Sequence, residues 1–205
     1  MEHEHEHEFV LEIPEFEHLS YEVEEGIALV TLKRPEALNA LSQSLLEELA
    51  EIPELVQQDP EVRVVMISGH ATIATAVQAL RPHVMGRIVI VFGAGGDRDR
   101  GKRPEMGRIA EALADVVIVT SDNPRTEDPD RILDDIESGM ARQDHVRIVD
   151  RRDAIAHALQ IATPHDVVVL AGKGHETYQI RGTTSYPFDE REIVNDLMVE
   201  RTAMR

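Results

Sequence analysis

The fold is decided by residues 88–119, which read IVIVFGAGGDRDRGKRPEMGRIAEALADVVIV. An uninterrupted apolar run opens this stretch, a glycine-rich charged loop follows, and a helical segment leads to a second apolar run. Strands that are covered on both faces need continuous apolar runs of this kind. The succession of strand, helix and strand therefore predicts two parallel strands with a helix packed over them.

The same alternation continues on both sides of this stretch. We expect further buried strands at residues 62–67, 146–149 and 167–170, and helices near residues 71–80, 104–113, 129–140 and 153–161. The fold class is therefore α/β, with a three-layer, mostly parallel, Rossmann-like sheet that the strand at 62–67 joins as a parallel member.

The two ends of the chain carry additional elements. Residues 19–34 predict an N-terminal β-hairpin, and residues 38–58 predict a helix that Pro53 ends or kinks, because proline lacks an amide donor. A small hairpin at residues 177–188 and a closing helix capped by Asp189 follow the main sheet.

Composition excludes several classes of protein. No run of 18 apolar residues supports a membrane span, and the absence of cysteine excludes disulfides, thiolate metal sites and a cysteine nucleophile. The net charge of −18 is concentrated at the front, where residues 1–70 hold 17 acidic and 3 basic side chains. Nucleic acid and anionic membranes would be repelled, so we expect neither as a partner. Because neither a membrane span nor a secretory signal is supported, we expect a cytoplasmic protein.

Three of the expected strands end in polar loops: GAGGDRDRGKRP after Phe92, TSDNPR after Val119 and AGKGHE after Leu170. The carboxyl ends of parallel strands lie on one edge of a sheet, where crevices for small ligands form. The sequence therefore predicts a ligand site built from these three loops.

The first loop fits neither standard nucleotide motif. Arg98 stands where a dinucleotide fingerprint needs its third glycine, and Arg103 replaces the serine or threonine that holds magnesium in a phosphate-binding loop. Two interpretations stay open. The loop is an anion clamp in which Arg98 grips a carboxylate, or it is a solvated charged turn.

The other two loops add complementary groups. Asn123 and Arg125 lie at the sheet edge in the second loop, and Gly172 in the third permits close backbone approach beside Glu176, a carboxylate that can receive an ammonium group. His175 is explained as well by a structural hydrogen bond as by a function. Two arginines, an amide and a carboxylate around one crevice predict a site for a small zwitterion, and an amino acid fits best.

Residues 73–198 closely resemble the C-terminal domain of the Mur ligases that add the third residue of the peptidoglycan stem peptide. The resemblance rests on VIVFGAGGDRDRGKRPEMGRIAEALADVVIVTSDNPR, DRRDAIAHAL and VVVLAGKGHETYQI. In that family the tetrapeptide D-N-P-R, here residues 122–125, marks enzymes that take meso-diaminopimelate. The resemblance places the amino-acid contacts of the family on Arg98, Asn123, Arg125, Gly172 and Glu176.

Residues 19–69 resemble a different family, the enoyl-CoA hydratases or crotonases. GIALVTLKRPEALNALSQSLLEELAE and DPEVRVVMISG look like the first strands and helix of that family. The segments that supply its oxyanion-hole amide and acid/base carboxylates have no counterpart here. The ATP-binding motif of Mur ligases, G-x-x-x-x-G-K-[ST], is also missing from the sequence, so we expect no catalytic residues, no metal and no cofactor.

Together these resemblances predict a chimera made in the laboratory. Residues 1–8, MEHEHEHE, look like an affinity tag, with a natural metal-binding tract as the rival interpretation. Residues 9–69 form the crotonase-like ββαβ segment and residues 70–205 the Mur-like domain, joined at residues 69–73 into one folded unit. The spacing does not assign His70 to either family.

The leading hypothesis for function is a folded chimera that is not an enzyme. The alternatives are a module that binds meso-diaminopimelate weakly and an active amide-bond ligase. The front hairpin comes from a larger sheet and keeps an unpaired edge, so we also expect a homodimer through the N-terminal segment.

Overall fold

The computed structural model describes residues 13–24, 27–33, 42–59, 62, 64–68, 77–78, 80–163, 165–173 and 176–203. The expected tag, the expected junction with His70, and His175 lie outside the described residues. The elements in chain order are β1 (Leu19–Glu24), β2 (Ile27–Leu32), α1 (Gln43–Gln58), β3 (Val64–Ser68), the 3₁₀ turn η2 (Arg81–His83), β4 (Ile88–Phe92), α3 (Lys102–Leu113), β5 (Val116–Val119), α4 (Pro129–Glu137), β6 (Val146–Arg147), α5 (Arg151–Ile161), β7 (Val167–Leu170), β8 (Tyr178–Arg181), β9 (Thr184–Pro187) and α6 (Glu190–Ala203).

The continuous apolar runs form a four-stranded sheet in the order β6-β5-β4-β7. Its three pairings are all parallel, and Ile90 lies opposite Val117 on one side and Val169 on the other. Every residue of β4 is buried, as a strand with two neighbours and two covered faces requires. The predicted α/β class with a parallel, Rossmann-like sheet is confirmed.

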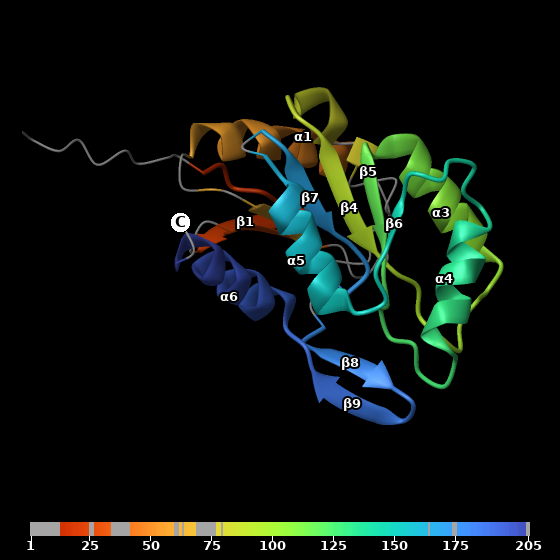
Figure 1. The fold of residues 1–205 in the computed structure, drawn as a ribbon. Coiled ribbons are helices and arrows are strands. Elements are labelled where there is room, and N and C mark those ends of the chain that lie inside the picture. Colours follow the sequence, from red (N-terminus) through yellow and green to blue (C-terminus); the bar gives the residue numbers. More distant parts are fainter. Residues whose placement is uncertain are drawn as a thin grey trace, which may run out of the picture.

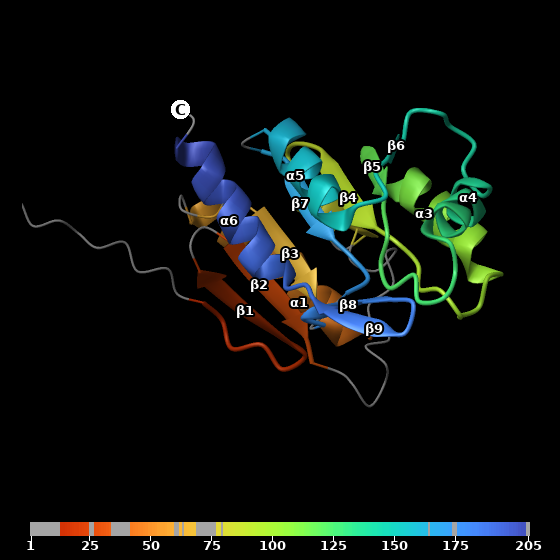
Figure 2. The ribbon, with the colours of Figure 1, turned by 60° about the horizontal axis from the view of Figure 1, so that its bottom comes forward.

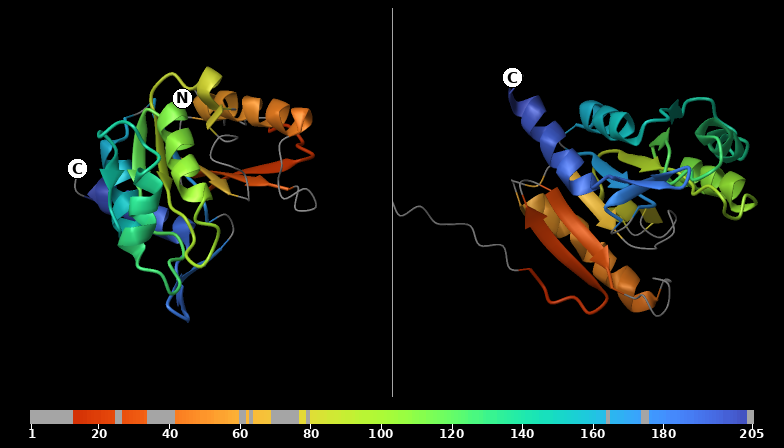
Figure 3. Two further views of the ribbon diagram at one scale, coloured as in Figure 1. Left: turned by 90° about the vertical axis from the view of Figure 1, so that its right-hand side faces the viewer. Right: turned by 90° about the horizontal axis from the view of Figure 1, so that it is seen from below.

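Helices cover both faces of the sheet and give it three layers (Figure 1, Figure 3). Ile90 and Phe92 point into an apolar cluster that also contains buried side chains of α1, α3 and α4. Val89 and Val91 point into the opposite cluster, with α5 and α6. Because successive strand residues face opposite sides, one short strand anchors both layers.

The front segment forms a second sheet in the order β1-β2-β3. β1 and β2 make the predicted hairpin, with Leu19 opposite Leu32, and β3 then pairs with β2 in parallel. β3 lies beside β7, so the N-terminal sheet β1-β2-β3 is positioned next to the main sheet (Figure 2). The expected strand at 62–67 is therefore present, as β3, and its hydrogen-bonded pairing with β2 is parallel. Among the described residues, β3 lies beside the main sheet without a hydrogen-bonded pairing to it.

Three element boundaries differ from the sequence predictions. α1 does not end at Pro53 but runs to Gln58, because burial of Leu45, Leu49 and Ile52 outweighs the amide bond that proline omits. α4 ends at Glu137, three residues early. β6 is reduced to Val146–Arg147 at the edge of the sheet, where one flank has no neighbouring strand among the described residues.

The C-terminal elements appear as predicted. β8 and β9 form a hairpin that projects from the lower edge of the main sheet (Figure 1). Asp189 caps α6, since its Oδ1 accepts from the backbone N–H of Arg191 at 2.9 Å. Among the described helices, none has the length and apolar character needed to cross a bilayer.

Candidate functional site

The loops that follow β4, β5 and β7 meet at the carboxyl edge of the main sheet, as predicted. Two glycines allow their backbones to come close. A Cβ on Gly93 would lie 2.2 Å from the carbonyl oxygen of Thr120, so no larger residue fits between the first and second loops. Gly172 adopts a φ of +112°, which favours glycine, and places the third loop against the Gly93 carbonyl.

Asn123 and Glu176 are in direct contact at the meeting point of the second and third loops. Asn123 is buried, and its Nδ2 donates to Glu176 Oε2 at 2.7 Å. The Asn123 Oδ1 accepts from the backbone N–H of Ile180 at 2.9 Å and from Lys173 Nζ at 3.1 Å. Asn123 and Glu176, two of the predicted site residues, thus form one hydrogen-bonded pair.

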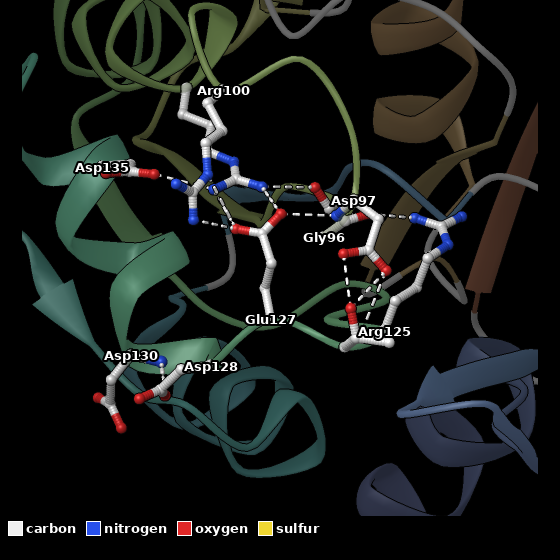
Figure 4. A network of polar contacts seen from close by, with 11 residues as sticks. Gly96, Asp97, Arg100, Arg125, Glu127, Asp128, Asp130 and Asp135 are labelled. Carbon is white, nitrogen blue, oxygen red and sulfur yellow. Dashed lines mark hydrogen bonds and ion pairs between the residues drawn. The ribbon is translucent and has the colours of Figure 1, made fainter.

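Arg125 is held in an unusual backbone conformation. Its φ of 51° lies in the left-handed region, and its N–H donates to the Ile180 carbonyl while its own carbonyl accepts from Gly182. The hairpin β8–β9 therefore fixes the backbone of Arg125 through a parallel bridge to Arg181. Its side chain turns to the first loop, where Nη1 donates to the Gly96 carbonyl at 2.8 Å (Figure 4).

Arg98 lies on the first loop and is exposed. A Cβ on Gly95 would contact Arg125 Nη1 at 3.0 Å and Arg98 Cγ at 3.4 Å, so both arginines lie beside this glycine. Within the described part of the chain, no hydrogen bond or ion pair engages the Arg98 guanidinium. The structure therefore brings together all five predicted residues, with Arg98 at the exposed side.

A charged cluster around the buried Arg103 supports this site, and the sequence analysis missed it. Arg103 is 1% exposed, and its guanidinium donates to both carboxylate oxygens of Glu127 at 2.9 Å and to Asp135 at 2.8 Å. Arg100 donates to Glu127 as well, and so does the backbone N–H of Asp97 (Figure 4). Glu127 thus ties the first loop to the second.

The pKa values of Glu127 and Arg103 reflect their pairing. The hydrogen bonds from Arg103, and then those from Arg100, hold the pKa of Glu127 well below its usual range. In return, the hydrogen bond to Glu127 raises the pKa of Arg103 against the opposing effect of burial. The only available sequence signal was the surplus of charges in DRDRGKRP, which does not say which arginine is buried.

The candidate site carries charged and polar side chains, but its described residues form no group of metal ligands. No group of three or more His, Asp or Glu side chains that could hold a metal ion occurs among the described residues. The arrangement offers a carboxylate for an ammonium group, an amide N–H₂ and two guanidinium groups for carboxylates. These groups are complementary in charge to the ammonium and carboxylate groups of an amino acid.

The chain is similar to known proteins in two overlapping regions. The family model for the Mur ligase, glutamate ligase domain matches residues 53–174, which is more than half of the chain and includes the first two loops and most of the third. The chain belongs to the Mur ligase family. Residues 22–78 also match the family model for enoyl-CoA hydratase/isomerase, and the two matches overlap at residues 53–78. The predicted double resemblance is confirmed.

Curated Mur ligases are close relatives. The UDP-N-acetylmuramoyl-L-alanyl-D-glutamate–2,6-diaminopimelate ligase of Thermosynechococcus vestitus is 45% identical over 170 residues, covering 78% of this chain and 34% of the relative. The ligase of the same name from Clostridium botulinum is 40% identical over 183 residues, covering 86% and 36%. A solved structure of a ligase of this name superposes with a TM-score of 0.64 at 30% identity, covering 94% of this chain and 33% of that one.

These relatives correct one expectation. We expected a protein that is not an enzyme, but relatives 40–52% identical to the chain are named as ligases, so that expectation is wrong. The chain spans about a third of the length of the curated relatives it matches.

Proposed function

We propose that this chain provides the part of an amide-bond ligase that binds and orients the incoming amino acid, and that this amino acid is meso-diaminopimelate. The contact that supports this most directly is the pairing of Asn123 with Glu176 at 2.7 Å, beside Arg125. The names of the relatives, which are 2,6-diaminopimelate ligases, agree with the chemistry of these groups.

The recognition follows from charge and geometry. A diaminopimelate molecule carries an ammonium and a carboxylate at each end. Glu176 Oε2 would accept from an ammonium group, and the Asn123 amide would donate to the neighbouring carboxylate instead of to Glu176. Arg98 and Arg125, which lie together at Gly95, would donate to a carboxylate in two-point fashion.

In the ligase reaction this chain would hold the acceptor so that one of its amines faces the carboxyl group to be joined. ATP is the co-substrate that the family resemblance implies, and no residue described here is assigned to it. Restricting the freedom of the bound amine is a large contribution to such a bimolecular step.

We also propose that the affinity of this chain alone is weak. Arg98 is exposed and Glu176 is part-exposed, so each ion pair with the ligand contributes roughly 0–1 kcal/mol. The loss of ligand freedom on binding offsets much of that gain, which leads to a dissociation constant of about 1 mM or weaker.

An NMR titration of isotope-labelled protein tests the proposal. Meso-diaminopimelate should shift signals of the loops at 93–101, 120–128 and 171–177, and L-lysine, which lacks the second carboxylate, should not. Arg125→Ala should abolish the shifts, whereas Arg131→Ala, which changes an exposed arginine of α4, should leave them intact. Equal responses to lysine, or no response at tens of millimolar, would contradict the proposal.

The origin of the chain is a separate proposal. The two family matches that overlap at residues 53–78 support a chain recombined from a crotonase-like front and a Mur-like back, and the alternating His-Glu start supports a laboratory origin. The division at residues 69–73 into a front segment and a domain of residues 70–205 is part of this proposal. Expression of residues 70–205 alone tests the one-unit part of this proposal, because a fold built across the junction should lose stability without residues 9–69. A back part that folds with unchanged stability would contradict it.

A further inference from the structure

Lys173 occupies a costly position directly beneath the candidate site. Its ammonium is fully buried, and lysine is almost never buried unless it is paired. It lies 3.3 Å from Asp122 Oδ1 and 3.8 Å from Glu176 Oε2, and 5.7 Å from the centre of the Phe188 ring. Nζ also donates to the Tyr178 carbonyl at 2.8 Å. One buried cation therefore touches the second loop, the third loop and β8.

The ammonium dictates how the Asn123 amide is oriented. An ammonium has donors only, so the group that Lys173 meets on Asn123 must be the oxygen. The backbone N–H of Ile180 fills the second acceptor position of the same oxygen. With both positions taken, the Nδ2 group has to point away from Lys173, and it points to Glu176 at 2.7 Å.

The same cation lies between two carboxylates. Burial lowers the pKa of Lys173, and the charge of Asp122 opposes that shift. The Asp122 and Glu176 carboxylates both lie within 4 Å of this ammonium, which offsets the repulsion between their like charges. Lys173 thus fixes the direction of the amide and holds the Glu176 carboxylate beside it.

We propose that Lys173 is the positioning residue of the acceptor site, which presents the Asn123 amide and the Glu176 carboxylate to the ligand without touching it. This inference rests on the proposed function of the site. Lys173 directly follows Gly172 in GKGHE, and its sequence context gives no sign of this role.

The first experiment needs no ligand. The side-chain amide signals of Asn123, assigned by their loss in Asn123→Ser, should change position in Lys173→Met because the oxygen loses its charged donor. The control is Arg87→Met, which removes a cation paired with Asp166 at the opposite edge of the sheet and should leave these signals in place. Unchanged Asn123 signals in Lys173→Met would overturn the inference.

The second experiment measures binding. Lys173→Met should bind meso-diaminopimelate about tenfold more weakly than Arg87→Met, the loss expected for one hydrogen bond to a charged group. If the unaltered protein binds no diaminopimelate, the proposed function fails, while the ligand-free Asn123 signals still decide the role of Lys173. Equal affinity of the two variants would count against positioning.

A third experiment separates charge from packing. The sequence has no cysteine, so Lys173→Cys introduces a single thiol that can be alkylated in the unfolded chain before refolding. An aminoethyl group rebuilds a lysine-like ammonium, and a propyl group has the same length without charge. We expect only the aminoethyl form to restore the Asn123 signals and the affinity. Equal restoration by the propyl form would mean that Lys173 acts by packing and not by its charge.

The unaltered protein gives a further check that does not depend on variants folding. During titration with meso-diaminopimelate, the Asn123 amide signals should move, while the ammonium signal of Lys173, on the far side of Asn123, should move much less. A Lys173 signal that moves as far as that of Asn123 would mean direct contact with the ligand and would overturn the inference.

Discussion

Arg103 donates two parallel hydrogen bonds to Glu127, each 2.9 Å long, and so joins the start of α3 to the loop that follows β5. The guanidinium is almost fully buried, and a buried charge is tolerated only when it is paired. The stability of the candidate site therefore depends on a residue pair outside the site itself.

Glu127→Gln should lower the free energy of unfolding at pH 7 by about 3 kcal/mol, because it leaves the buried Arg103 with Asp135 as its remaining carboxylate. Chemical denaturation measures this. Glu105→Gln, which breaks an exposed pair with Arg108 on the same helix, is the control and should change stability by less than about 0.5 kcal/mol.

The pH dependence of that difference has a definite sign. Since the pKa of Glu127 is lowered in the folded protein, its contribution is complete above the ordinary value of 4.5 and is lost as the pH falls through the folded value. The stability gap between the unaltered protein and Glu127→Gln should thus shrink below pH 4.5. A gap that is constant down to pH 2 would refute this account.

Gly96→Ala should loosen the contact between the first and second loops. A Cβ at this position would lie 1.8 Å from the Pro124 carbonyl oxygen, which is backbone and cannot rotate away. We expect a loss of about 2 kcal/mol in stability and weaker diaminopimelate binding. Gly101→Ala, on the exposed end of the same loop at φ −63°, should be nearly neutral, and comparable losses in both variants would argue against a specific contact.

Tyr21 should lose its proton only at an unusually high pH. Burial, followed by the charge of Asp59, raises the pKa of Tyr21 to about 12. A raised pKa means that its contribution to stability, about 2 kcal/mol, is present below pH 10 and is lost as the pH rises towards 12. The chain has three tyrosines and no tryptophan, so the difference in ultraviolet titration between the unaltered protein and Tyr21→Phe isolates this group. A midpoint near pH 10 would disprove the effect.

The homodimer stays a prediction. Among the described strands β1 pairs with β2 alone, so its other edge offers unpaired backbone groups to a second copy. Light scattering over a range of concentrations should give twice the monomer mass of 23.0 kDa at the upper end. A constant monomer mass would exclude this association. Repulsion between the acidic N-terminal segments of two copies would oppose it.

The sequence predicted those features that depend on local pattern. The continuous apolar runs identified β4, β5 and β7, and the parallel arrangement then brought Asn123 and Glu176 to one edge. The burial of Arg103 and Lys173 could not be predicted, because nothing in their local sequence distinguishes them from exposed cations and only the packing of distant loops selects them. Pro53 does not end α1 for a related reason, since the burial of the apolar face of α1 outweighs a local preference.

The bridge between Arg125 and Arg181 has a consequence for the order of events during synthesis. Arg125 is made more than fifty residues before Gly182, yet its carbonyl and amide find their partners only on the hairpin. A nascent chain that has emerged as far as the D-N-P-R tetrapeptide still lacks the groups that hold it in the left-handed conformation. The candidate site is therefore among the last parts of the molecule to form, completed when the hairpin closes.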